Sequence, residues 1–237
     1  FKSTFNSNWA PIGPSIVPDD NNGEPSGVGR VNCIAFHPTN ANIIFLGAPA
    51  GGFWKSTNGG ATWNTTTDDL GTLGVSDIAV NPDNPNIIYI ATGDGDAGDT
   101  YSIGILKSQN GGESWTSTGL TTLLSDNVII RRLIINPQTP AILIAATNQG
   151  IYRTTNNGVS WTNVQTGHFK DLEFNPANPD IVYAARYGSN SARFYKSVDG
   201  GASFTQVNTG VDLTQTYRLE LAVSSDTYPD VIYAVYS

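Results

Sequence analysis

One eight-residue phrase occurs four times in this 237-residue chain, in nearly the same letters each time. The copies are STNGGATW (56–63), SQNGGESW (108–115), TTNNGVSW (154–161) and SVDGGASF (197–204). Their third residues follow one another at intervals of 52, 46 and 43 positions. Repeats of this length are typical of a four-stranded β-propeller blade, so the chain is predicted to be an array of blades.

The letters of the phrase suit a tight turn between two strands. The Asn or Asp side chain can accept hydrogen bonds from backbone N–H groups ahead of it, and glycine adopts positive φ without strain. The closing Trp or Phe packs apolar surface beneath the turn. We therefore interpret this Asx-turn repeat as structural and expect no catalysis there. Its structural positions are Ser56, Asn58, Gly60, Trp63, Ser108, Asn110, Gly112, Trp115, Thr154, Asn156, Gly158, Trp161, Ser197, Asp199, Gly201 and Phe204.

A second pattern precedes each Asx-turn repeat: an apolar strand, an Asn-Pro or His-Pro turn and a β-branched strand. No segment shows helical periodicity over the length of a helix. The chain is therefore predicted to be all-β, the N-terminal part (1–237) of one β-propeller domain with four-stranded antiparallel blades. The expected blades are 30–66, 75–118, 129–165, 169–207 and half of a fifth at 217–237, with 8–14 as the outer strand of the closing blade.

About four and a half blades of a larger, roughly seven- or eight-bladed ring are thus expected, and the remainder of the protein's own chain would close it. A formal net charge of −8, with only 12 Lys plus Arg, argues against nucleic acid as a partner. No apolar run is long enough to span a membrane. The single cysteine, Cys33, is predicted to be a core residue.

The pattern Ser/Thr-x-Asx-x-Gly-x-Ser/Thr-Trp resembles the BNR or Asp-box repeat of sialidases, sortilin Vps10 domains and xyloglucanase-type glycoside hydrolases. Residues 29–63 are most similar to exported surface propellers of bacteria that use type IX secretion. This resemblance covers the chain from Asn8 onward and implies a secreted or cell-surface protein of bacterial origin. Because it rests on turn and core residues, it implies the fold more strongly than the function.

Blade connectivity predicts where a ligand would bind. Successive connections alternate between the two ends of a blade, so the Asn-Pro hairpins and the Asx-turn repeats share one face and the irregular loops share the other. Ligand sites concentrate in variable loops on a rigid scaffold, so we expect a glycan or protein ligand on the irregular face. The candidate ligand-binding residues are Asp94, Asp96, Tyr101, Arg186 and Tyr187.

The loop GDGDAGD (93–99) is the candidate metal site. Asp94, Asp96 and Asp99 place three carboxylates on a glycine-rich loop, and carboxylates are the ligands that calcium prefers. The spacing is not that of an EF-hand loop, and the alternative is a solvated loop whose Asp side chains cap their own turns. Calcium is the one cofactor that the sequence suggests.

No catalytic residue is assigned from the sequence. The resemblance to xyloglucanases implies a catalytic Asp two residues before the Gly-Gly that opens the third strand of an early blade, but Pro49 stands there before Gly51 and Gly52. The Arg-Ile-Pro motif of sialidases is absent, although Arg131 and Arg218 are expected near the irregular face. His168 could approach that face, but a single His predicts neither a triad nor a zinc site.

Alignment of the first strands places Asp77, Arg132, Asp171 and Glu220 at equivalent positions of consecutive blades. Ion pairs between blades are therefore expected from Asp77 to Arg132 and from Arg132 to Asp171. Three functions remain open. The main prediction is a non-catalytic, secreted or cell-surface module for glycan or protein binding or adhesion that acts through its irregular face. The alternative is a secreted glycoside hydrolase, xyloglucanase- or sialidase-like, with part of its site in the missing blades. A sortilin-like receptor is a third possibility with the same fold.

Overall fold

The computed structural model describes residues 29–96, 99–188, 192–208, 216–224 and 231–236. The chain divides into two compact units, Phe1–Arg30 and Val31–Ser237, and the description below concerns the second. The outer strand expected at 8–14 lies outside the described residues.

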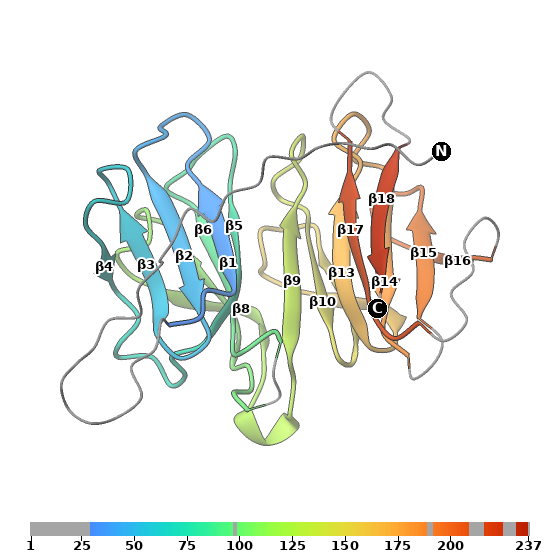
Figure 1. Cartoon of the computed structure of the whole chain (residues 1–237), viewed down its shortest axis with the longest axis horizontal. Coiled ribbons are helices and arrows are strands. Elements are labelled where there is room, and N and C mark those ends of the chain that lie inside the picture. Colours follow the sequence, from blue (N-terminus) through green and yellow to red (C-terminus); the bar gives the residue numbers. More distant parts are fainter. Residues whose placement is uncertain (1–28, 97–98, 189–191, 209–215, 225–230, 237) are drawn as a thin grey trace, which may run out of the picture. The chain divides into compact units, whose positions relative to one another are not determined.

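The second unit consists of four four-stranded sheets and one two-stranded sheet, whose strands run antiparallel (Figure 1). Blade 1 contains β1 (Cys33–Phe36), β2 (Ile44–Ala48), β3 (Gly52–Ser56) and β4 (Asn64–Thr65). Blade 2 contains β5 (Val75–Val80), β6 (Ile88–Thr92), β7 (Gly104–Ser108) and β8 (Thr116–Thr121). Blade 3 contains β9 (Ile130–Ile135), β10 (Leu143–Thr147), β11 (Gly150–Thr154) and β12 (Thr162–Thr166). Blade 4 contains β13 (Phe169–Phe174), β14 (Val182–Arg186), β15 (Arg193–Ser197) and β16 (Thr205–Val207), and the fifth sheet contains β17 (Leu219–Val223) and β18 (Ile232–Tyr236).

Each blade is an up-and-down sheet whose first strand is innermost. The first strands of consecutive blades contact one another, from β1 to β5, β9, β13 and β17. One 3-10 turn, η1 (Leu124–Asp126), is the only helical element among the described residues, and none of them forms a helix that could cross a membrane. The prediction of an all-β propeller of about four and a half blades is therefore confirmed.

The Asx-turn repeats form closely similar turns. In the first copy, the Ser56 hydroxyl donates to Asn58 Oδ1 at 3.0 Å and accepts from Gly60 N at 2.8 Å. Asn58 Oδ1 also accepts from Thr62 N at 2.9 Å. In the same copy, Gly59 N donates to the carbonyl oxygen of Asn42, in the hairpin between β1 and β2, at 2.9 Å. The hairpin and the Asx turn therefore lie at the same end of the blade, so the loops that enter each blade or join its second and third strands lie at the other end.

In the second, third and fourth copies, the glycine at the fifth position of the turn also packs its blade against the preceding one. A Cβ atom on Gly112 would lie 2.7 Å from Cε1 of Phe53, in blade 1. In blade 3 the turn around Gly158 contacts Tyr89 of blade 2, whose hydroxyl donates to the Asn157 carbonyl at 3.2 Å. Only a residue without a side chain allows this close approach, and the positive φ of Gly112 (+91°) adds to the requirement.

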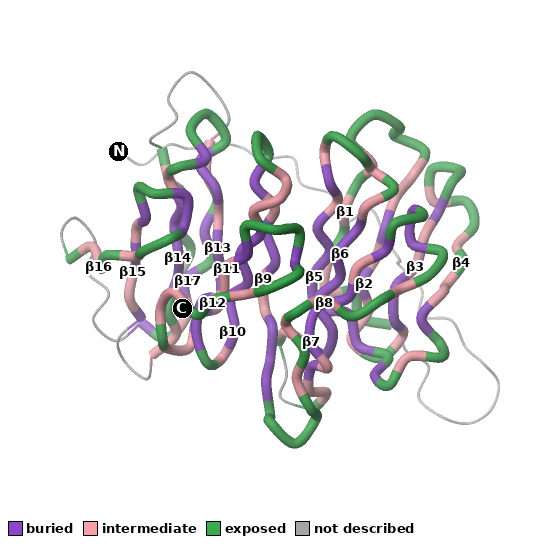
Figure 2. The backbone as a smooth tube through the Cα atoms, turned by 180° about the vertical axis from the view of Figure 1, so that it is seen from behind, coloured by how far each residue is buried: buried purple, intermediate pink, exposed green. Residues whose placement is uncertain are grey.

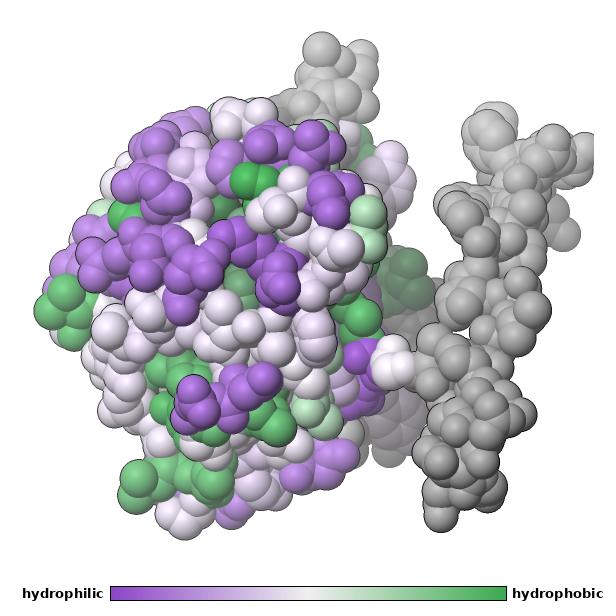
Figure 3. Space-filling view, turned by 90° about the vertical axis from the view of Figure 1, so that its left-hand side faces the viewer, coloured by the Kyte–Doolittle hydropathy of each residue, from purple (hydrophilic) through white to green (hydrophobic). Residues whose placement is uncertain are grey.

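The hydrophobic core lies between blades, so each of its four clusters joins residues of two neighbouring sheets. Phe45 and Phe53 of blade 1, for example, pack with Ile88 and Ile90 of blade 2. Figure 2 shows buried residues along the strands and exposed residues at the connections. The outer side of blade 1 is mostly hydrophilic or neutral, with small hydrophobic areas (Figure 3), and its edge strand β4 has only two residues. A short edge strand limits pairing with other chains.

Candidate functional site

Three consecutive inner strands carry a β-bulge at the same place. In β5, Val75 lies opposite Thr92 and Asp77 lies opposite Ala91, so Ser76 is an extra residue. The same shift leaves Arg131 extra in β9 and Lys170 extra in β13. A bulge re-aims the side chains beside it. As a result, each of these strands presents two consecutive side chains to one cavity, instead of alternate ones.

This cavity has a volume of about 400 Å³ and lies along the first strands of the blades. The loop after β6 contributes Gly95 and Asp96, and the start of β17 contributes Arg218 and Glu220. The bulges occur where the irregular loops enter the blades, so the cavity is on the side where ligand binding is expected.

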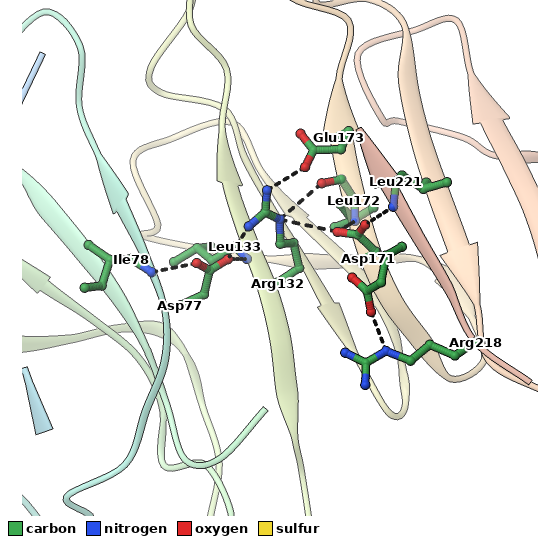
Figure 4. A network of polar contacts seen from close by, with 10 residues as sticks. Asp77, Ile78, Arg132, Leu133, Asp171, Leu172, Glu173, Arg218 and Leu221 are labelled. Atoms are coloured by element: carbon green, nitrogen blue, oxygen red, sulfur yellow. Dashed lines mark hydrogen bonds and ion pairs between the residues drawn. The ribbon is translucent and has the colours of Figure 1, made fainter. Parts of the chain in front are cut away.

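A deeper layer of charged residues links three blades (Figure 4). Asp77 accepts hydrogen bonds from Ile78 N at 2.9 Å and, across the blade boundary, from Leu133 N at 2.7 Å. In blade 4, the carboxylate of Asp171 accepts from Leu172 N at 2.9 Å and from Leu221 N of the next inner strand at 2.6 Å. Each carboxylate therefore connects its own strand to the following blade.

Arg132 lies between these two carboxylates. Its guanidinium nitrogens are 3.7 Å from Asp77 Oδ2, 3.4 Å from Asp171 Oδ1 and 2.6 Å from Glu173 Oε1. The predicted ion pairs of Arg132 with Asp77 and Asp171 are confirmed, and Glu173 is a third partner that the alignment did not indicate.

The balance of charges in this layer shifts the pKa of its members. Burial raises the pKa of Asp77 and Glu173, and raises that of Asp171 to about 6. Burial also opposes the charge of Arg132, but the three carboxylates together raise its pKa. Burial disfavours every charge in this layer. One guanidinium is too little to offset it for three carboxylates, whereas three carboxylates more than offset it for Arg132. The oxygens of Asp77 and Asp171 bind backbone amides and Arg132, so these two carboxylates hold neighbouring blades together, and we call them latches.

Three cations line the outer part of the cavity: Arg131, Lys170 and Arg218, hereafter the cation cluster. Arg131 Nε donates to His168 Nε2 at 3.0 Å, and Arg131 Nη1 donates to the Gly95 carbonyl. Lys170 Nζ lies over the ring of Tyr187, 4.9 Å from its centroid. Arg218 pairs with Asp96 at 2.9 Å and also with Glu220.

The cations of this cluster disfavour one another. Burial lowers the pKa of Lys170, and the charges of Arg131 and Arg218 lower it further. Burial also lowers the pKa of Arg131, an effect that Asp96 opposes and Arg218 enhances. The pKa of His168 falls to about 4 through burial, Arg131 and Lys170, so its imidazole is neutral at pH 7. Burial also opposes the charge of Arg218, but its hydrogen bonds to Glu220 and Asp96 raise its pKa. Repulsion between the cations therefore affects chiefly Arg131 and Lys170.

The predicted loop residues occupy different environments. Asp94 is only 1% exposed, and its Oδ1 accepts from Asn32 Nδ2 at 3.3 Å and from Asp96 N at 3.0 Å. Asp96 lines the cavity and pairs with Arg218, while Tyr101 is half-buried and Asp99 exposed. Across the described ranges, no three His, Cys, Asp or Glu side chains cluster as at a metal centre, and calcium stays a prediction.

The other two predicted residues are neighbours that face different surroundings. Arg186 is exposed at the end of β14. The Tyr187 ring packs against His168, with 4.9 Å between ring centroids, and under Lys170. Structure therefore brings Asp96 to the cavity and Tyr187 beside a residue that lines it. Lys170 was not predicted, because its role depends on a bulge that leaves no mark in the sequence.

Two further positions bear on catalysis. Pro49 is half-buried in the turn between β2 and β3, and a Cβ atom on Gly74 would lie 2.8 Å from its carbonyl oxygen. The residue is thus part of a closely packed connection. Burial raises the pKa of Cys33, which disfavours the thiolate that a nucleophile would require.

No protein-family model matches the chain. Among curated proteins, the chain is similar to the xyloglucanase Xgh74A of Acetivibrio thermocellus, with 27% identity over 217 residues, covering 76% of this chain and 26% of that protein. It is also similar to a xyloglucanase from Paenibacillus sp, with 26% identity over 218 residues, 77% of this chain and 21% of that protein. The chain thus spans about a quarter of the length of the curated relatives it matches.

Among solved structures, the Niastella koreensis GH74 enzyme matches with a TM-score of 0.66 and 24% identity, over 89% of this chain and 33% of the other. These similarities confirm the β-propeller fold and the resemblance to xyloglucanase propellers. They favour the glycoside hydrolase alternative over the main prediction of a non-catalytic binding module.

Proposed function

We propose that the protein is a xyloglucanase-type glycoside hydrolase and that this chain supplies part of its propeller. The observation that carries the proposal is the similarity to xyloglucanases, which extends over 76% of the chain and is not confined to one motif. A polymeric glycan cannot cross a membrane, so a secreted or cell-surface location accompanies this proposal.

Glycoside hydrolysis generally requires two carboxyl groups that flank the scissile bond. Asp77 and Asp171 are committed to backbone amides and to Arg132, so we exclude them from that role. Asp96 is different, because its side chain is 53% exposed and lies on an irregular loop at the cavity. Asp96 can therefore contact a substrate at the cavity, and Glu220, whose side chain is 48% exposed and lines the same cavity, is a second such carboxylate.

The test is an assay of the full protein on xyloglucan, with cellulose and mixed-linkage β-glucan as comparison polymers. A hydrolase generates new reducing ends from xyloglucan, at a rate that exceeds the rates on the other two polymers. Asp96→Asn is compared with Asp99→Asn, an exposed carboxylate of the same loop. We expect the first variant to lose more activity than the second. A folded protein that releases no reducing ends from any of the polymers would overturn the proposal.

A second candidate, non-catalytic glycan binding, is favoured by one observation. Pro49 occupies the place where the resemblance to xyloglucanases implies a catalytic Asp. A protein that only binds xyloglucan would migrate more slowly in native gels that contain this polymer and would generate no reducing ends from it. Gel retardation and the hydrolysis assay on the same preparation therefore separate the two functions.

A further inference from the structure

Two half-buried cations, Arg131 and Lys170, line the cavity. Within the described part of the chain, neither Arg131 nor Lys170 has a carboxylate within ion-pair distance, whereas Arg132 and Arg218 both do. Arg131 donates instead to a neutral imidazole and a backbone carbonyl, and Lys170 contacts the face of Tyr187.

These two cations occupy equivalent bulge positions of neighbouring blades. Arg131 and Lys170 are the extra residues of the bulges in β9 and β13, and both line the cavity. In regular strands without a bulge, their side chains would point in other directions. Partial burial of two unpaired like charges side by side costs stability. Groups that burial and neighbouring charges perturb in this way cluster at functional sites.

We propose that the cation cluster binds a sugar residue that carries a single negative charge, a uronate or a sulfate ester, with the anionic group between Arg131 and Lys170. The ring of Tyr187 lies beneath Lys170 and packs against His168, so it positions the lysine at the cavity. The inference rests on the proposed function only in taking a glycan as the ligand.

The charges at the cavity favour one negative charge over two. Four cations and five carboxylates line the cavity. Asp77, Asp171 and Glu173 share Arg132, and Asp96 and Glu220 share Arg218, which leaves Arg131 and Lys170 as the two cations that can pair with an anionic group. Because carboxylates already outnumber cations here, a group with one negative charge is repelled less than a group with two. A dianion such as a phosphate ester would leave excess negative charge beside the carboxylates of Asp171 and Glu173, which line the same cavity.

The experiment is isothermal titration calorimetry of the full protein with glucuronic acid, glucose 6-sulfate and glucose. We expect at least one acidic sugar to bind about tenfold more tightly than glucose, and its affinity to fall as salt is added. Lys170→Gln should weaken that binding about tenfold. The matched control is Lys196→Gln, since Lys196 also lies over a tyrosine ring in blade 4 but does not line the cavity.

Thermal melting shows whether each variant is folded. A preference for glucuronic acid alone or for the sulfate alone identifies the anionic group. If neither acid binds better than glucose, or if Lys170→Gln binds the acids as tightly as Lys196→Gln does, the inference is wrong. Loss of the proposed hydrolase function leaves this binding result unaffected, and hydrolysis of xyloglucan without any acidic preference refutes only the inference.

Discussion

Substitution of Asp77, which connects blade 2 to blade 3, tests directly how neighbouring blades are held together. Asp77→Ala removes the acceptor of two backbone donors, Ile78 N and Leu133 N, the second of which belongs to the next blade. Arg132 keeps Asp171 and Glu173 as partners, so its charge remains compensated.

The magnitude follows from those contacts. Each buried donor left without an acceptor costs about 1–3 kcal/mol. Burial of the Asp77 carboxylate is itself unfavourable, as its raised pKa indicates. Removal of this carboxylate therefore offsets part of the stability lost with its hydrogen bonds. We therefore expect Asp77→Ala to lower the free energy of unfolding by about 2–4 kcal/mol. Asp77→Asn keeps one acceptor oxygen and should cost about half as much.

Urea denaturation measures this loss as a shift of the midpoint at an unchanged m-value. The control is Asp83→Ala, because Asp83 is an exposed residue of the hairpin between β5 and β6 and its replacement should cost less than about 0.5 kcal/mol. If Asp77→Ala destabilises the protein no more than Asp83→Ala does, the carboxylate is not a latch and this account of blade cohesion fails.

Three other predictions concern the packing and the charge of the same unit. Gly112→Ala forces a Cβ against Phe53 at a φ of +91° and should cost about 2–3 kcal/mol in denaturation, whereas Gly71→Ala, with open space around it, should be nearly neutral. Tyr89→Phe loses the bond to the Asn157 carbonyl and should lower the free energy of unfolding by about 0.5–1.5 kcal/mol, measured in the same way. The pKa of His168 is about 4 in the folded state and 6.5 in the unfolded state. The neutral imidazole therefore contributes to the free energy of unfolding above pH 6.5, and this contribution is lost as the pH falls towards 4. After allowance for the partial exposure of His168, this contribution is about 1–2 kcal/mol. Denaturation at pH 7 and 4.5 should show a smaller change in the free energy of unfolding for His168→Gln than for the wild type. An equal change in both proteins would contradict this prediction.

Much of the fold could be predicted because the determinants of a blade are local. The bonds that close the turn at Ser56, Asn58 and Gly60 all join residues within a few positions of one another. A pattern of that kind is visible in the letters of the sequence and repeats with the blades. The ion pairs of Arg132 could also be predicted, because equivalent positions of consecutive inner strands lie side by side in a propeller.

The candidate site was less predictable, because its residues depend on strand register. Alternation along β13 gives no sign that Lys170 and Asp171 both face the cavity, and only the bulge brings them there. Asp94 illustrates the converse. Its place in an acidic glycine-rich loop suggested a ligand, but the fold buries its side chain against Asn32 of another blade.

The sequence by itself therefore determined the all-β architecture, the number of described blades and two of the three partners of Arg132, Asp77 and Asp171, since each depends on short-range turn chemistry or on the repeat. Tertiary structure decided which charged side chains meet at the cavity. Arg131 and Lys170 both line the cavity because β9 and β13 each contain a bulge. Burial weakens solvent screening around the two charges. Neither the bulges nor the burial can be inferred from the sequence of one strand.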